Sequence, residues 1–381
     1  MKNPFEYGGV VSGKAFCNRK KEVADLLRAI ENGEKIFVYS ERRFGKTSLV
    51  RIALEKLPQK KYLTAYVDLW PTDGERSFIT VTAKAIAESM STKTDKILEL
   101  AKTFFSRLTP SITVDEQGKP KVTFGIGKLD NMGPELDEVL SAPAKIAAQR
   151  KQKVAVVFDE FQQILEYGND LVERRLRSII QHHRDICYIF LGSRKHLIQK
   201  MFLDRSRPLY RSGGHYPLGP ISEKDWLPFI RQKFIEAGKY IGDEQIHKIF
   251  LLTEGHPFYT QHLSHALWDL CEQGTKISDD LVETAVQILL DRESYAYTTL
   301  WESLTLSQRR LLKGLATESR GIRIFASLFI QKHGLSSAST AQRAVESLLE
   351  KDIIDRDNGS FVIVDRFFKV WVKRIQESKG I

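Results

Sequence analysis

The sequence predicts an α/β fold, with a parallel sheet covered by helices on both faces, followed by two smaller parts. Three observations predict it. Short apolar, β-prone runs alternate with amphipathic helical stretches between residues 36 and 191. From Gly219 to residue 291 only helical patterns follow. From residue 307 the pattern is three helices and then a hairpin.

Composition indicates a folded protein of several domains. The chain has 381 residues, which suggests two or three domains, and it is 42% hydrophobic and 28% charged, as soluble globular proteins are. No apolar run reaches the length of a membrane span, and the N-terminus lacks an apolar signal segment. We therefore expect a cytoplasmic protein without membrane contact. Three scattered cysteines are expected to be reduced packing residues: Cys17, Cys187 and Cys271.

The net charge of +10 favours polyanionic partners, nucleic acid first. Because many ordinary intracellular proteins are also basic, this charge is a weak indication by itself. The position of the basic residues along the chain carries more information than their sum.

A phosphate-binding motif lies in residues 36–48. The β-prone run Ile36–Tyr39 leads into a polar loop, then Gly45–Ser48, and then a helical pattern. In this order of strand, loop and helix, backbone N–H groups and the helix dipole attract a phosphate. Lys46 can reach the β- and γ-phosphates, and Thr47 can hold Mg²⁺. The full Walker A motif begins with glycine, where this chain has Ser40, so its nucleotide affinity stays open.

A second acidic element strengthens this interpretation. The apolar run from Lys153 to Phe158 ends in Asp159 and Glu160. An aspartate at the carboxyl end of a core strand beside a phosphate loop is a Walker B residue, which positions Mg²⁺. The alternative is a buried strand followed by a helix that Asp159 caps.

The other elements of the first part follow in order. We expect a helix over Val23–Ile30, capped by Asn18 and stopped by Gly33. The remaining expected elements are a strand at 61–69, a helix at 76–105, a hairpin insertion within 108–134 whose strands 111–114 and 121–126 flank a turn at 115–118, a helix at 135–150, a helix at 171–183 and a strand at 187–191.

The second and third parts follow Gly219. Four helical patterns are expected at 222–238, 243–253, 257–273 and 278–291. Three more, at 307–316, 322–333 and 337–351, precede a hairpin at 353–364 with an Asn358-Gly359 turn, which is the pattern of a winged helix-turn-helix. The expected domains are therefore a core at 1–218, a helical lid at 219–295 and a winged helix at 296–381.

With these motifs in place, the chain resembles archaeal-type ATPases of the AAA+/STAND group of P-loop NTPases, which carry a helical lid and a C-terminal winged helix. The likeness covers essentially the whole chain. The matching pieces are Asn3–Phe5, Phe16–Arg19 with Glu22, Arg43–Ser48, Phe158–Glu160, Leu191–Ser193, Gly255–Pro257 and Asp365–Trp371. The departures are Ser40 in the loop and Asn18, where relatives have glycine.

The resemblance implies ATP and Mg²⁺ as cofactors and assigns roles to single residues. Thr47 and Asp159 would hold the metal, Glu160 would polarise the attacking water, and Ser193 would sense the γ-phosphate. The residues implied to bind the nucleotide are Arg19, Arg43, Phe44, Gly45, Lys46, Thr47, Ser48, Asp159 and Pro257.

Several of these roles have ordinary alternatives. Ser193 could be a helix N-cap, His256 beside Pro257 an ordinary histidine, and Arg19 one half of a surface ion pair. Arg184 and Arg211 are candidates for an arginine finger, although arginines in basic chains often serve solubility.

The third helix of the winged helix could meet double-stranded DNA. Its start is rich in small polar residues, with positive charge nearby. The residues concerned are Ser336, Ser337, Ser339, Thr340, Gln342, Arg343, Lys332, Lys351 and Arg356. Five acids on the same segment would repel phosphates, namely Glu346, Glu350, Asp352, Asp355 and Asp357. Winged helices also dock onto proteins or lids, so DNA and a protein partner both stay open.

Two functions therefore remain. The first is a slow, Mg-dependent ATPase that works as a molecular switch, whose nucleotide state moves the lid and the winged helix and which could assemble with copies of itself. The second is a DNA-binding or adaptor protein that holds nucleotide structurally with little turnover. Glu160 favours the first, because a protein that only binds nucleotide needs no catalytic base.

Overall fold

The computed structural model describes residues 2–90, 94–114, 118, 120–127, 131–357 and 359–377. Its contacts divide the chain into two compact units. The core unit comprises Arg19–Ser40 and Lys46–Leu218, and the C-terminal unit comprises Met1–Asn18, Glu41–Gly45 and Gly219–Ile381. The short loop Glu41–Gly45 thus belongs by its contacts to the C-terminal unit, although the chain on both sides of it belongs to the core unit.

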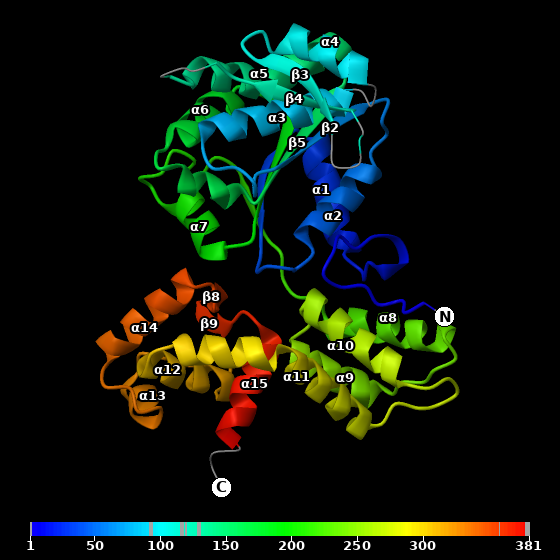
Figure 1. Ribbon diagram of the computed structural model, residues 1–381, viewed down its shortest axis with the longest axis vertical. Coiled ribbons are helices and arrows are strands. Elements are labelled where there is room, and N and C mark those ends of the chain that lie inside the picture. Colours follow the sequence, from blue (N-terminus) through cyan, green and yellow to red (C-terminus); the bar gives the residue numbers. More distant parts are fainter. Residues whose placement is uncertain are drawn as a thin grey trace. The chain divides into compact units, whose positions relative to one another are not determined.

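A parallel sheet forms the centre of the core unit (Figure 1). Its strands, in spatial order, are β2 (Tyr62–Asp68), β5 (Lys153–Asp159), β6 (Ile186–Gly192), β1 (Lys35–Tyr39) and β7 (Gly214–Pro217). The register pairs Asp68 with Asp159 and Tyr39 with Gly192. The carboxyl ends of β2, β5, β6 and β1 therefore lie at one edge of the sheet, which is where ligands bind in open α/β sheets.

Helices cover both faces of this sheet, as the sequence predicts. One group contains α1 (Lys20–Glu31) and α2 (Lys46–Glu55), and the other contains α3 (Glu75–Met90), α5 (Gly133–Arg150) and α6 (Leu171–Ile180), while α7 (Lys195–Leu203) follows β6. The central strands β1, β5 and β6 are buried along nearly their whole length because both faces are covered. Stacked rings fill the core between them, with Phe158 lying against Phe78 and Phe190.

The insertion after α3 contains a helix and a hairpin. Helix α4 spans Thr94–Phe104, and β3 (Thr109–Val114) pairs antiparallel with β4 (Pro120–Gly125). The expected single helix at 76–105 is described as two helices, with residues 91–93 outside the described residues. The expected turn residues 115–117 also lie outside them.

The C-terminal unit is helical, with a small hairpin near its end. Its elements are α8 (Glu223–Glu236), α9 (Asp243–Thr253), α10 (Pro257–Leu270), α11 (Asp279–Ser303), α12 (Leu306–Thr317), α13 (Ser327–Lys332), α14 (Ala338–Glu350), β8 (Ile354–Asp357), β9 (Ser360–Ile363) and α15 (Arg366–Glu377). One continuous apolar core includes Trp226, Leu312 and Phe368. The N-terminal segment is part of it, because Phe5 is buried and Lys233 donates to the Pro4 carbonyl at 2.8 Å.

Some expected boundaries were wrong. Helix α13 begins only at Ser327, because residues 319–326 form turns rather than a helix. Helix α6 ends at Ile180 instead of residue 183, and α11 continues past residue 291 to Ser303. Several elements had no prediction, namely the short, polar strand β7, helices α7 and α15, and the 3-10 helices Gly13–Ala15 and Phe161–Tyr167.

The predicted caps of α1 had different outcomes. Asn18 does not cap α1, because Arg19 occupies the N-cap position with φ +98° and Asn18 instead donates to Asp225. The stop at Gly33 is confirmed, since Gly33 follows the C-cap with φ +66° and a Cβ there would collide with the Arg184 carbonyl.

Among the described residues, none of the helices has the length and apolar character that crossing a bilayer requires.

Candidate functional site

The loop after β1 carries its lysine in a buried position. Lys46, which is only 5% exposed, donates to the Ser40 hydroxyl at 3.1 Å and approaches the Ser40 carbonyl at 3.4 Å. Ser40 is not among the residues with positive φ, so its backbone does not need the glycine of the full motif. Serine at this position therefore fits the loop and adds a contact to the lysine.

The turn into α2 is shaped to receive an anion. Arg43 and Gly45 have φ of +58° and +83°, and α2 begins at Lys46. Left-handed residues in a turn just before a helix help to point backbone N–H groups toward one side. Together with the helix dipole, this makes a site that favours phosphate.

The predicted metal ligands lie together in the core unit. Thr47 donates its hydroxyl to Oδ2 of Asp159 at 2.8 Å, and the Glu160 N–H donates to Oδ1 at 2.9 Å. A hydroxyl beside a carboxylate is the oxygen donor set that Mg²⁺ uses in nucleotide sites, where phosphates and waters complete the coordination. Among the described residues, no group of three or more His, Cys, Asp and Glu side chains is arranged so that it could hold a metal ion.

Tyr66 is a member of this cluster that the sequence analysis missed. Its hydroxyl donates to the same Oδ2 of Asp159, and the guanidinium of Arg51 lies 4.9 Å from its ring centre. Burial, followed by the charge of Asp159, raises the pKa of Tyr66, so the hydroxyl stays protonated and remains a donor. The sequence pattern alone does not distinguish Tyr66 from other β-prone residues of the same strand, which is why it was missed.

Glu160 and Ser193 are also brought together. The Ser193 hydroxyl donates to Oε2 of Glu160 at 2.7 Å, and Gln162 donates to the same oxygen. Ser193 is not the N-cap of α7, because Arg194 occupies that position. Gln162 lies 3.3 Å from the Ser193 hydroxyl and was not singled out from the sequence. The carboxylate therefore has a fixed orientation at the carboxyl edge of the sheet.

The candidate arginines lie elsewhere. Arg19 is buried and pairs at 3.0 Å with Glu22, which is partly exposed, so the ion pair is partly buried. Arg184 and Arg211 are exposed and precede β6 and β7, which places them at the amino edge of the sheet, opposite the loop. Neither can therefore reach the phosphate loop of its own chain.

In the C-terminal unit, the start of α10 contacts the loop Glu41–Gly45. His256 caps α10 by accepting the Phe258 N–H at 3.2 Å, and its Nε2 lies 3.2 Å from the Arg42 carbonyl. The ring of Phe44 meets His256 edge-to-face, with centroids 4.4 Å apart, and Pro257 is the first residue of α10. His256 is buried, so its geometry is that of a packing and capping residue.

On the winged helix, the polar start of α14 is engaged in its own cap. Ser337 accepts the Thr340 N–H at 3.1 Å, and the hydroxyls of Ser336 and Ser339 bond to neighbouring hydroxyls. Arg343 and Lys351 are exposed. Three of the five nearby acids are paired within the protein or buried. Asp352 pairs with Arg42, Asp357 pairs with Arg320, and Asp355 is buried. The turn residue Asn358 lies outside the described residues.

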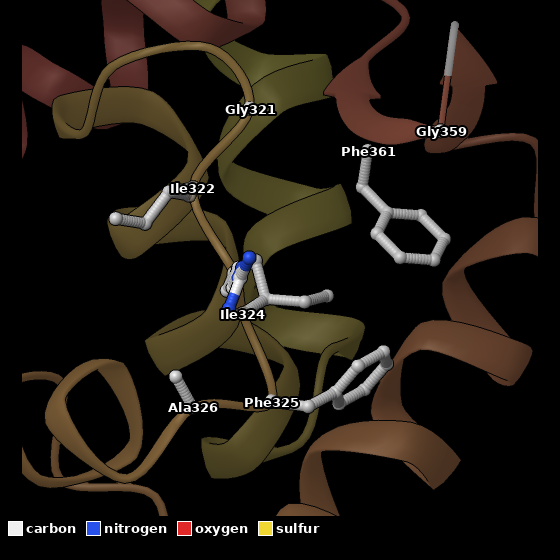
Figure 2. A pocket seen from close by; sticks show the side chains of 8 residues that line it. Gly321, Ile322, Ile324, Phe325, Ala326, Gly359 and Phe361 are labelled. Carbon is white, nitrogen blue, oxygen red and sulfur yellow. The ribbon is translucent and has the colours of Figure 1, made fainter.

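A pocket of about 470 Å³ lies beside the β8–β9 hairpin, which is the wing of the winged helix (Figure 2). It is lined by residues 321–326, Gly359 and Phe361, and the rings of Phe325 and Phe361 meet edge-to-face at 6.2 Å. Figure 2 shows that Ile322 points away from Phe361, whereas the Phe325 ring lies on the same side as the wing. Most of the lining is apolar, and Arg323 adds a charged side chain.

Fold and loop geometry together define a P-loop ATPase core followed by a winged helix. The chain belongs to the family of ATPase domains found predominantly in Archaea, whose sequence model matches residues 16–263. A second family, of winged helix domains described as probable, matches residues 295–374. The expected family and fold are therefore confirmed.

Solved structures agree on the fold. A Walker-type ATPase of Pyrococcus abyssi shares 16% identity with a TM-score of 0.63, over 97% of this chain and 99% of that one. The ORC2 protein of Aeropyrum pernix, in its ADPNP and ADP complexes, shares 13% identity with a TM-score of 0.53, over 100% of this chain and 98% of that one. None of the curated proteins matches this sequence.

Proposed function

We propose that this protein is an Mg-dependent ATPase of slow turnover that works as a STAND-type switch. In this proposal the lid (219–295) and the winged helix (296–381) respond to the nucleotide held by the core (1–218). The observation that supports it best is the pairing of Glu160 with Ser193 at 2.7 Å, one residue beyond an Asp159 that already contacts Thr47. A protein that only stores nucleotide has no need for a second, oriented carboxylate.

Each residue has a role in this proposal. Lys46 holds the β- and γ-phosphates, and the backbone of 43–48 holds the phosphate oxygens. Thr47 and Asp159 would hold Mg²⁺, which neutralises charge on the phosphates when bound. Glu160 accepts a proton from the attacking water, with Ser193 orienting its carboxylate. Arg19 and Pro257 remain proposed nucleotide contacts.

The test is nucleotide binding by calorimetry with Mg²⁺ and ATP. Lys46→Ala should abolish binding, because the loop loses its buried cation for the phosphates. The matched control is Lys56→Ala, which removes an exposed lysine just beyond α2 and should leave the affinity unchanged. Equal ATP affinity in Lys46→Ala and the parent would refute the assignment of the loop.

Double-stranded DNA is a second candidate ligand, proposed for the winged helix. Three nearby acids are paired within the protein or buried, whereas Arg343 and Lys351 are exposed on and just after α14. The repulsion that the sequence suggested is therefore weaker than the acid count implies. Duplex binding would depend strongly on salt, because phosphate contacts release counterions. A protein partner at the apolar pocket and a nucleotide-dependent homo-oligomer remain alternatives for this proposal.

A further inference from the structure

A cluster of four charged side chains, two of them buried and two partly exposed, lies in the C-terminal unit. It joins Glu41 of the loop Glu41–Gly45, Glu254 after α9, and Arg366 and Lys369 of α15. Glu41 and Arg366 are each only 2% exposed. The two positive and two negative groups face one another, which offsets the cost of burying Glu41 and Arg366.

The guanidinium of Arg366 is the centre of this cluster. Its Nη2 lies 2.9 Å from Oε2 of Glu41, its Nε lies 3.0 Å from Oε2 of Glu254, and its Nη1 donates to the Val364 carbonyl at 3.0 Å. Lys369 reaches the other oxygen of Glu254 at 2.5 Å. Burial alone would raise the pKa of Glu254, but Arg366 and Lys369 outweigh it and the net shift is downward.

Stability alone does not account for such an arrangement. A buried ion pair costs much desolvation, and apolar side chains of similar volume often stabilise a fold as well or better. What a buried pair does provide is one defined geometry, because a displaced partner would leave a charge unpaired in the interior. The residue fixed here is Glu41, which directly follows the first residue of the phosphate loop.

The rest of this loop is attached to the same unit. Arg42 pairs with Asp352, which follows α14, at 3.1 Å, and the guanidinium of Arg43 lies 4.4 Å from the ring centre of Phe258. The loop thus contacts residues of the lid and of the winged helix at several points, while its last residue, Gly45, leads directly into Lys46.

We propose that Arg366 is a positioning residue for the phosphate-binding loop. Through Glu41 it holds the loop in the shape that receives phosphate, and it thereby links nucleotide binding to the packing of α15 in the winged helix. This inference rests on the proposed function, in which this loop binds ATP. Because linkage is reciprocal, nucleotide at the loop stabilises the Glu41–Arg366 pair as much as the pair stabilises bound nucleotide.

The experiment compares ATP affinity by calorimetry in the parent, Glu41→Gln, Arg366→Met and the double variant. Each single substitution should weaken ATP binding about tenfold, within the range usual for linked sites. The double variant should be no weaker than the weaker single one, because the two residues act as a pair. The control is Arg374→Met, which removes an arginine of the same helix that pairs with Glu283 at 2.9 Å, and should keep the parent affinity.

A second readout separates a positioning role from a purely structural one. Hydrogen exchange at the backbone of 41–45, without nucleotide, should be faster in Glu41→Gln and Arg366→Met than in the parent and the control. If Arg366→Met does not fold, Glu41→Gln and the conservative Arg366→Lys carry the test. Folded variants with parental ATP affinity and parental exchange would overturn the inference. A parent that binds no ATP would overturn the proposed function instead, and exchange would still decide whether the pair holds the loop.

Discussion

Glu160→Gln is the substitution that tests the chemistry most directly. The amide has nearly the same shape as the carboxylate, and its oxygen can still accept the Ser193 hydroxyl that now lies 2.7 Å from Oε2. The backbone N–H of residue 160 continues to donate to Asp159. The metal and phosphate contacts of the proposed site are therefore unchanged, and only the ability to accept a proton is lost.

The two expected effects differ in size. A hydrogen bond to a charged group contributes about 1.5–3 kcal/mol and a neutral one about 1 kcal/mol, so stability should fall by roughly 1 kcal/mol. Loss of a general base slows a reaction by about 10²–10⁴-fold, which is roughly 2.7–5.5 kcal/mol of activation free energy. ATP affinity should stay close to that of the parent.

Single-turnover hydrolysis of radiolabelled ATP, with the affinity measured in parallel, separates these effects. The control is Glu166→Gln, which changes an exposed acid in the same 3-10 helix Phe161–Tyr167 and should leave the rate unchanged. If Glu160→Gln hydrolyses ATP as fast as the parent, Glu160 is not the base. A parent with no hydrolysis at any Mg²⁺ concentration would favour structural nucleotide storage.

Two further predictions concern pH and DNA. Burial, with help from the nearby charges of Lys35 and His182, lowers the pKa of His183 to about 4. The folded state thus keeps this histidine neutral, so its contribution to stability is complete above about pH 6.5 and is lost as the pH falls toward 4. In urea unfolding, the free energy of unfolding of His183→Gln should therefore fall less between pH 7 and pH 5 than that of the parent. An equal fall in both proteins would contradict this prediction. Reversing Arg343 and Lys351 to glutamate should weaken duplex binding in fluorescence anisotropy and lower its salt slope by about 1 per lost phosphate contact, whereas no binding by the parent at low salt would remove DNA as a ligand.

The parts of the fold that follow from a local sequence pattern could be predicted from the sequence. The strand–loop–helix at Lys46 and the acidic end of β5 follow from hydrophobic runs and their boundaries, and in the structure Thr47 donates to Asp159. Strand β7 was not predicted, because a run of only four residues that begins with glycine and ends with proline carries no β-strand pattern. The sequence pattern of residues 322–326 predicts a helix, yet this segment is not helical and lines the pocket. Ile324 is buried there, and this tertiary packing outweighs the local helix propensity.

Long-range pairings were not predictable. Tyr66 lies 93 positions from Asp159, and Arg366 lies 325 positions from Glu41. Neither residue differs in local pattern from an ordinary strand tyrosine or helix arginine. Only the fold shows that their side chains end in the interior beside a carboxylate, and such contacts decide how a motif is held.

The outer strand β7 has a consequence for association. It closes one edge of the sheet, contributes only Gly214–Pro217, and ends in a residue without a backbone N–H group. An additional strand from another chain would find few donors there, so this edge resists sheet extension and the aggregation that follows from it. If copies of the protein assemble, β7 is poorly suited to join them by strand pairing.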